Sequence, residues 1–343
     1  MDKQIVFVEK NRAELLDVES LPLGANQVRV KTIFSTISNG TERANITGDP
    51  TVSISSKADD EVVFPRMSGY STAGIVVEKG EGVKDLEIGD RVAMYWTHHR
   101  GYNVVNEKNV VKIESDNVSF EEASMAHIAA FPLAALRKTR LEIGESAMVM
   151  GLGILGLLAV QFAHSAGAVP VIAVDPIKER REKALEFGAD FAFDPFEEDF
   201  TEKVKAVTNG GVNVAIEVTG QGAGLNETLD CMAKFGRVAL LGCTRNSDFS
   251  VDFYRKVHGP GISLIGAHTL ARPESDSSAG YFTTADDMKV ILNLCAKKRI
   301  NLKGMIEETH SPLECREVYD RLVNDKKFPT VVQFDWERLL LKE

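Results

Sequence analysis

Apolar and polar residues alternate along much of the first 120 residues, in short runs separated by glycine, proline and aspartate. The alternation is clearest over residues 27–31, 74–78 and 89–93, which read QVRVK, GIVVE and GDRVA. A period of two puts the apolar side chains on one face of a strand, and glycine permits tight turns between strands. The pattern predicts an antiparallel β domain in this part of the chain.

The pattern changes near residue 120, where strand-length apolar runs begin to alternate with helical periods. Ser119, followed three residues later by Glu122, predicts a helix that starts with a capping box. Strands are expected over residues 147–150, 170–174, 212–218, 237–241 and 262–267, and helices over 155–167 and 178–187. Continuous apolar strands joined by helices are typical of a parallel, doubly wound α/β sheet. After about residue 270 the pattern becomes mixed and ends in a strand-like run at 330–334.

Composition and charge narrow the class of protein. The chain has 343 residues, 44% of them apolar and 26% charged, which is ordinary for a soluble protein of two domains. A formal net charge of −10, with no basic block, argues against nucleic acid and membrane surfaces as partners. The apolar run at 147–160 is too short to span a bilayer, and the first residues carry no secretion signal. Four cysteines without paired spacing indicate reduced thiols, as in a cytoplasmic protein.

The strongest chemical signal is the motif Gly151-x-Gly153-x-x-Gly156, which follows a predicted buried strand and opens a predicted helix at Ile154 and Leu155. The first glycine permits a tight turn, the second a close approach of a pyrophosphate, and the third close packing of helix on strand. The helix N-terminus then offers unpaired N–H groups to the phosphates. The motif therefore predicts a dinucleotide site, although the same glycines could serve helix packing alone.

Asp175 ends the next predicted strand, where a carboxylate accepts hydrogen bonds from the hydroxyls of an adenosine ribose. A 2′-phosphate would be repelled there, so NAD(H) is expected rather than NADP(H). Asp175 could also be a solvated strand end. Arg180 and Arg181 could pair with a 2′-phosphate, but on a charged helix face they are expected to point to solvent.

Two later glycine turns, at residues 217–220 and 241–244, follow predicted strands of the same sheet. Ligands of such sheets bind beyond the carboxyl ends of the strands, so Thr219 and Cys243 are candidate cofactor contacts. Either turn could instead be an ordinary connection.

Several segments together resemble the medium-chain dehydrogenase/reductase superfamily, in its alcohol and polyol dehydrogenase branch. They are Asn39-Gly40-Thr41-Glu42 and the segments 65–74, 89–92, 101–105 and 143–190, so the resemblance covers nearly the whole chain. It implies a β-rich GroES-like catalytic domain, residues 1–125 and 270–343, and a Rossmann domain, residues 126–269. It also implies NAD(H)-dependent interconversion of an alcohol and a carbonyl of a small-molecule substrate. A homodimer or homotetramer, paired through the strand at 262–267, is implied as well.

The departures from the family pattern concern zinc. The resemblance places the ligands of a catalytic zinc at Asn39, Tyr70 and His127, and only histidine among these is a good zinc ligand. The segment between Val92 and Gly101 is too short for the family's structural zinc lobe and contains no cysteine. Neither zinc is therefore expected. One alternative is a site rebuilt from Glu42, His98, His99 and His127, although adjacent histidines in a strand point to opposite faces.

Without zinc, a side chain must stabilise the developing alkoxide and deliver a proton. The resemblance puts Tyr70 and His127 in the zinc pocket, where the tyrosine could donate its hydroxyl hydrogen and the histidine act as acid or base. It also makes Thr41 a proton relay and Asn39 a substrate-orienting amide. Tyr70 could instead only fill the space of the metal, and His127 could be a core histidine. Four more residues could line the pocket or be structural: Glu42, Trp96, His99 and Tyr102.

Two other functions remain open. The zinc-free quinone and enoyl reductases of the same superfamily reduce activated C=C bonds, mostly with NADPH, and Asp175 argues against that cofactor. A protein that binds NAD(H) without catalysis is the third possibility, since zinc-site residues are replaced. The sequence does not choose the substrate.

Overall fold

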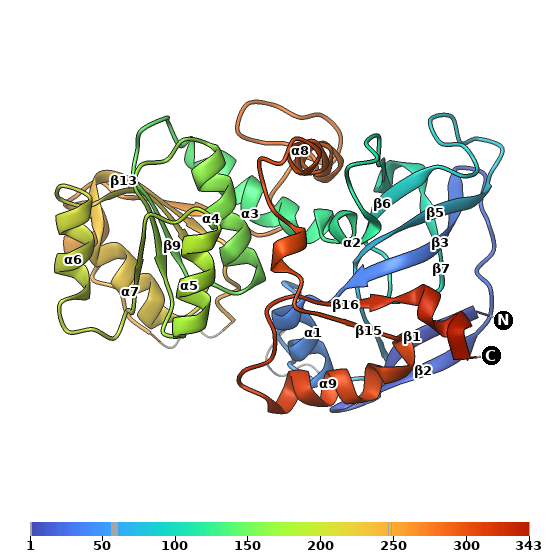
Figure 1. Ribbon diagram of the computed structural model, residues 1–343. Helices are drawn as coiled ribbons and strands as arrows, with labels where there is room; N and C mark the ends of the chain where they lie inside the picture. The colour runs from blue at the N-terminus through green and yellow to red at the C-terminus, as the bar shows by residue number, and fades with distance from the viewer. Residues whose placement is uncertain (1, 56–60, 246, 248, 343) are drawn as a thin grey trace. The chain divides into compact units, whose positions relative to one another are not determined.

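The computed structural model describes residues 2–55, 61–245, 247 and 249–342 (Figure 1). The chain divides into two compact units, Met1–Ile128 with Met288–Glu343 and Ala129–Asp287. We call them the β-rich unit and the α/β unit. The second boundary lies beyond the expected residue 270, because side chains hold the segment after it within the α/β unit. Arg272 donates to the carbonyl oxygen of Ala130 at 2.7 Å and lies 3.4 Å from the carboxylate of Asp287.

The β-rich unit contains two sheets with mostly antiparallel pairing. In the described residues the smaller sheet has the strand order β2-β1-β4, and the larger has the order β15-β16-β3-β5-β6-β8, with β7 paired to β3. These strands are β1 (Asp2–Glu9), β2 (Arg12–Val18), β3 (Gln27–Thr36), β4 (Arg66–Met67), β5 (Ser71–Lys79), β6 (Arg91–Tyr95), β7 (Tyr102–Asn106), β8 (Val110–Lys112), β15 (Glu308–His310) and β16 (Val332–Asp335). The α-helices are α1 (Asn39–Ile46), α2 (Phe120–Ala123) and α9 (Cys315–Asn324). Short 3-10 helices are η1 (Glu107–Asn109), η3 (Lys303–Met305), η4 (Pro312–Glu314) and η5 (Trp336–Lys342).

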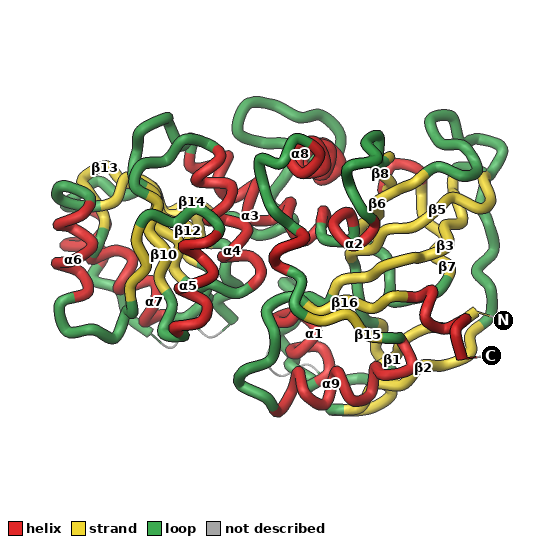
Figure 2. The backbone as a smooth tube through the Cα atoms, in the orientation of Figure 1, coloured by secondary structure: helices red, strands yellow, loops and turns green. Residues whose placement is uncertain are grey.

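The α/β unit is built on a parallel sheet with the order β11-β10-β9-β12-β13-β14 over its described strands. The strands are β9 (Ala147–Met150), β10 (Val171–Val174), β11 (Phe191–Phe193), β12 (Val212–Glu217), β13 (Met232–Leu240) and β14 (Ser263–Gly266). The helices are α4 (Ile154–Ser165), α5 (Lys178–Glu186), α6 (Phe200–Val207), α7 (Gly222–Asp230) and the π-helix η2 (Tyr254–His258). Figure 2 shows α4 and α5 on one face of this sheet and α6 and α7 on the other. The predicted fold class, a doubly wound parallel sheet with a β-rich domain, is confirmed.

Two helices contain the residues at which the chain passes from one unit to the other, α3 (Ala126–Thr139) and α8 (Thr284–Ala296). None of the described helices is both long enough and apolar enough to cross a membrane.

The predicted elements differ from the observed ones mainly at their ends. The strand at Ala147–Met150 and the capping box of Ser119 and Glu122 are confirmed. Strand β13 starts at Met232, five residues before the predicted Arg237. The register shifts between the first pair of β12 and β13 and the next, and Phe235 has a φ of 63°. Such an irregularity has no period-two signature, so the alternation missed it.

Candidate active site

The sequence-predicted cofactor residues lie at one edge of the parallel sheet in the α/β unit. Strands β10, β9, β12 and β13 are neighbours in that order. Their carboxyl ends meet there because the strands are parallel. Gly151, Asp175, Thr219 and Cys243 each follow one of these strands within a few residues. The structure therefore brings the four segments together, including the two turns for which the sequence left the role open.

The glycine turn has the local geometry that its spacing predicts. Gly151 has a φ of 96°, which side chains other than glycine rarely adopt. A Cβ on Gly156 would lie 1.9 Å from the carbonyl oxygen of Gly151, so α4 packs on the turn only with glycine there. Gly153 is the N-cap of α4, and a Cβ there would meet no described atom within 4 Å. Ile154 and Leu155 form the first turn of the helix, whose N-terminus faces this open space.

Asp175 is buried, with 4% of its surface exposed. Its Oδ2 accepts from the backbone N–H of Leu152 at 2.8 Å, and its Oδ1 accepts from that of Ile177 at 2.8 Å. An ionised carboxylate has about four acceptor positions, so each oxygen retains one for a further donor. The first of these contacts ties the glycine turn to the end of β10.

The expectation that Arg180 and Arg181 point to solvent is wrong. Nη1 of the Arg180 guanidinium lies 3.6 Å from Oδ2 of Asp175, and Arg181 donates to the carbonyl oxygen of Asp175 at 2.7 Å. Arg181 also lies 3.1 Å from the carboxylate of Asp194, and only 18% of its side chain is exposed. Both guanidinium groups turn back because these acceptors at the ends of β10 and β11 attract them. The carboxyl end of β10 thus combines the buried carboxylate of Asp175 with the cations of Arg180 and Arg181.

The turn after β12 is organised by Glu217, which the sequence analysis did not single out. Its buried carboxylate accepts from the backbone N–H groups of Thr219 at 2.7 Å and Gly220 at 3.2 Å, and from the hydroxyl of Thr219. Burial raises the pKa of Glu217, although these hydrogen bonds oppose the rise. A Cβ on Gly220 would lie 2.6 Å from the carbonyl oxygen of Cys243, so the two turns touch. An acidic residue that ends an apolar strand before Thr-Gly was the available sequence signal.

In the β-rich unit, Tyr70 and His127 come together although 57 residues separate them. Nδ1 of His127 lies 2.8 Å from the carbonyl oxygen of Tyr70, and the two rings meet edge to face with centroids 5.3 Å apart. A carbonyl oxygen only accepts, so Nδ1 carries a hydrogen and Nε2 is the basic nitrogen of the neutral ring.

Two further aromatic rings complete this arrangement, which we call the aromatic cluster: Tyr70, Tyr95, Trp96 and His127. The ring centroid of His127 lies 5.3 Å from that of Tyr95 and 4.8 Å from that of Trp96. His127 is fully buried, Tyr70 is half-buried, and Trp96 is 46% exposed. The cluster therefore presents Tyr70 and Trp96, rather than His127, to the outside.

The hydroxyl of Tyr70 donates to Oγ of Ser38, a residue that the sequence analysis missed. Behind Ser38 lies a buried polar network. Glu42 accepts from the N–H of Ser38 at 2.9 Å and from the hydroxyl of Tyr319, and its Oε2 lies 3.1 Å from Nε2 of His99. Two candidate pocket residues, Glu42 and His99, are thus interior residues that support Ser38.

Asn39 and Thr41 lie in the first turn of α1, next to Ser38. The amide nitrogen of Asn39 donates to the carbonyl oxygens of Pro329 at 2.9 Å and Thr330 at 3.2 Å. The amide oxygen of Asn39 is buried and has no hydrogen-bond partner among the described residues. Thr41 is half-buried.

These donors do not suit a catalytic zinc. Asn39 and Tyr70 both direct hydrogens at protein oxygens, and His127 is the one imidazole among the three family positions. In the part of the chain that the structure describes, no group of three or more His, Cys, Asp or Glu side chains could hold a metal. The alternative set of Glu42, His98, His99 and His127 is accordingly not gathered into one site.

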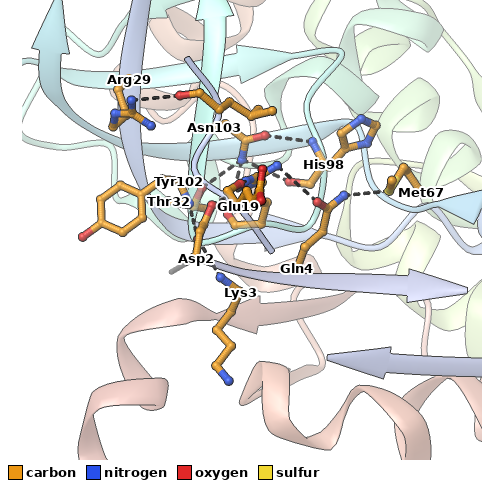
Figure 3. A network of polar contacts seen from close by, with 12 residues as sticks. Asp2, Lys3, Gln4, Glu19, Arg29, Thr32, Met67, His98, Tyr102 and Asn103 are labelled. Carbon is orange, nitrogen blue, oxygen red and sulfur yellow. Dashed lines mark hydrogen bonds and ion pairs between the residues drawn. The ribbon is translucent and has the colours of Figure 1, made fainter. Parts of the chain in front are cut away.

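The segment between Val92 and Gly101 and the residues that follow it are held by buried polar contacts (Figure 3). Nε of Arg100 lies 2.5 Å from the carboxylate of Asp2. The side chain of Asn103 accepts from the N–H of His98 at 3.0 Å and donates to the hydroxyl of Thr32 at 3.0 Å. Figure 3 shows the Tyr102 side chain pointing away from His98.

Comparisons with known proteins agree with this architecture. The chain matches the family models "Alcohol dehydrogenase GroES-like domain" over residues 24–136 and "Zinc-binding dehydrogenase" over residues 155–278. L-threonine 3-dehydrogenase of Thermococcus kodakarensis is 30% identical over 288 residues, which cover 74% of this chain and 78% of that protein. D-guloside 3-dehydrogenase of Escherichia coli K12 is 26% identical over 291 residues, covering 80% and 83%. The crystal structure of an alcohol dehydrogenase of E. coli CFT073 with NADH superimposes with a TM-score of 0.82 at 20% identity, covering 98% of this chain and 99% of that one.

Proposed function

The chain belongs to the medium-chain dehydrogenase/reductase superfamily, among its zinc-type alcohol dehydrogenase-like oxidoreductases, and we propose on that premise that it works without the zinc. The reaction is the NAD(H)-dependent interconversion of an alcohol and a carbonyl. The observation that carries this proposal is the hydroxyl of the half-buried Tyr70, which lies beside His127. The resemblance implies that Tyr70, His127 and Asn39 replace the ligands of the family's catalytic zinc. The relatives named for threonine and for a guloside support a hydroxylated substrate of the polyol or sugar-derived class.

The α/β unit supplies groups that suit the cofactor. The open space at Gly153 and the N-terminus of α4 accommodate a pyrophosphate, whose charge the helix N-terminus favours. Asp175 has acceptor capacity for the hydroxyls of the adenosine ribose. Arg180 partly offsets the charge of Asp175, so we expect a preference for NAD(H) over NADP(H) rather than complete exclusion of the latter.

When bound, NAD(H) supplies or accepts the hydride at the substrate carbon. The work of the chain is to manage the proton at the substrate oxygen. In the reducing direction Tyr70 gives its hydroxyl proton to that oxygen, and in the oxidising direction it takes the proton back. Nδ1 of His127 contacts the backbone carbonyl oxygen of Tyr70. Because His127 is fully buried, we assign it the role of holding Tyr70 in place rather than that of a proton donor. The exposed ring of Trp96 offers an apolar surface beside the Tyr70 ring, at a centroid distance of 6.0 Å.

Asn39 and Thr41 complete the proposed site from the first turn of α1. The amide nitrogen of Asn39 is engaged by backbone oxygens, which leaves its amide oxygen as the acceptor for a substrate hydroxyl. Thr41 is proposed as the hydroxyl that passes protons to solvent.

The test is a turnover assay with NAD⁺ and a panel of secondary alcohols and polyols, on protein prepared without a metal-affinity column. Part of each preparation is treated with a zinc chelator, and its metal content is measured. We expect turnover that survives chelation. Activity that disappears with the chelator and returns with zinc would overturn the zinc-free proposal. Reduction of enones without turnover of any alcohol or ketone would replace the alcohol dehydrogenase reaction with C=C reduction.

A further inference from the structure

Ser38 occupies the N-cap position of α1 but does not cap the helix. An N-cap serine normally accepts a hydrogen bond from an N–H of the first helical turn through its hydroxyl. The hydroxyl of Ser38 makes no such bond within the described structure. The side chain is nonetheless 7% exposed, so its direction is set by the protein rather than by water.

The same chain contains two serines that cap in the usual way. Ser119 accepts from the N–H of Glu122 at 3.3 Å, and Ser311 accepts from the N–H of Leu313 at 3.4 Å. In both, the glutamate three residues later reaches back to the serine N–H, which completes a capping box. Ser38 has a contact like the backbone half of this arrangement, because Glu42, four residues later, accepts its N–H at 2.9 Å. The Ser38 hydroxyl, in contrast, bonds to a group outside the helix.

That partner is Tyr70, whose hydroxyl donates to Oγ of Ser38. The contact joins residues 32 positions apart, from α1 and from the segment before β5. A serine released from capping and directed at the proposed proton donor is unlike the two ordinary caps. The difference points to a role in the chemistry of Tyr70.

The position of Ser38 is fixed from behind by residues that solvent does not reach. Glu42 is 2% exposed, and His99 and Tyr319 are both fully buried. His99 is itself held through Nδ1 by the hydroxyl of Ser35 at 2.8 Å. These buried residues, and the hydrogen bond from the N–H of Ser38 to Glu42, fix the backbone of Ser38. The serine hydroxyl can then change direction mainly by rotation about its own side-chain bonds.

We propose that Ser38 is the positioning residue of Tyr70 and that its hydroxyl stabilises the tyrosine after proton transfer. The proposal rests on the proposed function. During reduction, hydride from NADH bonds to the carbonyl carbon while the π electron pair of C=O moves to oxygen. That oxygen takes the hydroxyl proton of Tyr70, and the electrons of the broken O–H bond remain on the phenolate. In the structure the single hydroxyl hydrogen of Tyr70 is donated to Ser38, and on substrate binding it turns to the carbonyl oxygen. The Ser38 hydroxyl then turns and donates to the Tyr70 oxygen, which becomes the phenolate, and water returns the proton to Tyr70 after product leaves.

The experiment compares Ser38→Ala, Tyr70→Phe and the double variant in kcat, KM and pH profile. A lost hydrogen bond to a charged oxygen corresponds to a decrease in kcat of about 10- to 100-fold for Ser38→Ala, with little change in KM. The double variant should be no slower than Tyr70→Phe, because Ser38 acts through Tyr70. Ser38→Thr keeps a hydroxyl and should restore most of the activity. Independent, multiplicative losses would overturn the proposal.

A spectroscopic titration separates this proposal from the proposed function. The ultraviolet difference between the protein and Tyr70→Phe isolates the ionisation of Tyr70 without any turnover. In Ser38→Ala the measured pKa of Tyr70 should rise, because the phenolate loses a donor. An unchanged value overturns the role of Ser38 even where the enzyme is active. A raised value in a protein that turns over no alcohol or carbonyl would support the pair and reject the proposed function.

The matched control is Ser311→Ala, which removes a serine hydroxyl that does cap a helix. It should lower the melting temperature and leave kcat and the Tyr70 titration unchanged. Ser38→Ala should show the opposite pattern, with a small effect on melting and a large one on kcat. A Ser38→Ala variant that loses activity only in proportion to its melting temperature would contradict the proposal.

Discussion

At the residue scale, the partner of each polar group decides what chemistry remains open to it. The two oxygens of Asp175 each hold a backbone N–H, and the same carboxylate has Arg180 3.6 Å away. The cofactor preference of the ribose site therefore depends on two opposing groups. The Asp175 carboxylate favours the ribose hydroxyls of NAD(H), and the nearby arginine favours the 2′-phosphate of NADP(H). Changing the carboxylate should move this balance more than it moves overall affinity.

We predict that Asp175→Ala lowers the ratio of kcat/KM for NAD⁺ over NADP⁺ by at least about 10-fold, equivalent to about 1.4 kcal/mol. The variant removes the like charge that repels a 2′-phosphate and leaves Arg180 and Arg181 to bind it. Steady-state kinetics with both cofactors provide the measurement. Asp190→Ala is the control, since Asp190 accepts from the N–H of Val171 at the other end of β10. An equal ratio in the Asp175 variant and the parent would show that this carboxylate does not select the cofactor.

Tyr70→Phe should lower kcat by about 10²- to 10⁴-fold and leave the affinity for NADH unchanged, because the variant loses only the proposed general acid. Steady-state turnover and a fluorescence titration with NADH measure the two quantities. Tyr95→Phe is matched to it, since the ring of Tyr95 also contacts His127 but its hydroxyl donates to the carbonyl oxygen of Lys108 at 2.7 Å. Similar losses in both variants would assign the effect to packing of the aromatic cluster instead of proton transfer.

The sequence predicted the local parts of the site better than the long-range ones. The glycine motif and Asp175 could be placed because strand, turn and helix follow one another within 25 residues. The pairing of Tyr70 with Ser38 and of Glu42 with His99 joins distant segments, and no period or spacing encodes it. Arg180 and Arg181 were misplaced because helix periodicity does not show which acceptors end the neighbouring strands.

At the element scale, β15 is an edge strand that a side-chain network attaches to helix α9. Arg321 of α9 donates to both carboxylate oxygens of Glu308 at 2.9 Å, and His310 lies 2.8 Å from the same carboxylate. The hydrogen bonds from Arg321, followed by those from His310, lower the pKa of Glu308 from 4.5 to about 2. A group whose pKa is lower in the folded state stabilises the protein above its unfolded pKa and loses that effect as pH falls.

Glu308→Gln should therefore lower the free energy of unfolding at pH 7, by about 1 kcal/mol for a partly exposed bidentate pair. The deficit should shrink as pH falls from 4.5 toward about 2, where Glu308 takes up a proton in the folded state. Urea unfolding of both proteins across this range gives the comparison. A deficit that is independent of pH would assign it to altered packing of β15 and not to the charge of Glu308.

Element cores followed from the sequence more reliably than element ends. Hydrophobic pattern alone located β9, β10 and β12 to within about one residue, since β9 and β10 are apolar throughout and β12 is apolar apart from Asn213 and Glu217. The early start of β13 was not encoded in this way, because Phe235 adopts a positive φ and is 78% exposed. Irregular geometry at such points depends on the pairing partner, which a single segment does not reveal.

At the scale of the whole molecule, the parallel sheet ends in a strand with one open edge. In the described strand order β14 pairs with β13 on one side and lies at the end of the sheet. Its residues are exposed or half-buried, and Leu264 and Ile265 at its centre are apolar. An uncovered apolar edge strand invites pairing with another chain. We therefore propose that two copies pair through β14, as the homo-oligomer implied by the resemblance would do.

Light scattering at micromolar concentration should then give the mass of a dimer or tetramer of the 37.6 kDa chain. Ile265→Lys places a charge on the edge strand, and burial of that charge between two copies would be unfavourable, so the variant should have a lower mass. Leu264 is left unchanged because it packs against the core of the α/β unit. Phe196→Lys introduces the same charge at a position that is 83% exposed and outside β14, and its mass should equal that of the parent. A monomeric parent would reject the pairing outright. An oligomer that Ile265→Lys leaves intact would place the contact on another surface, because a buried lysine at the edge could not be accommodated without dissociation.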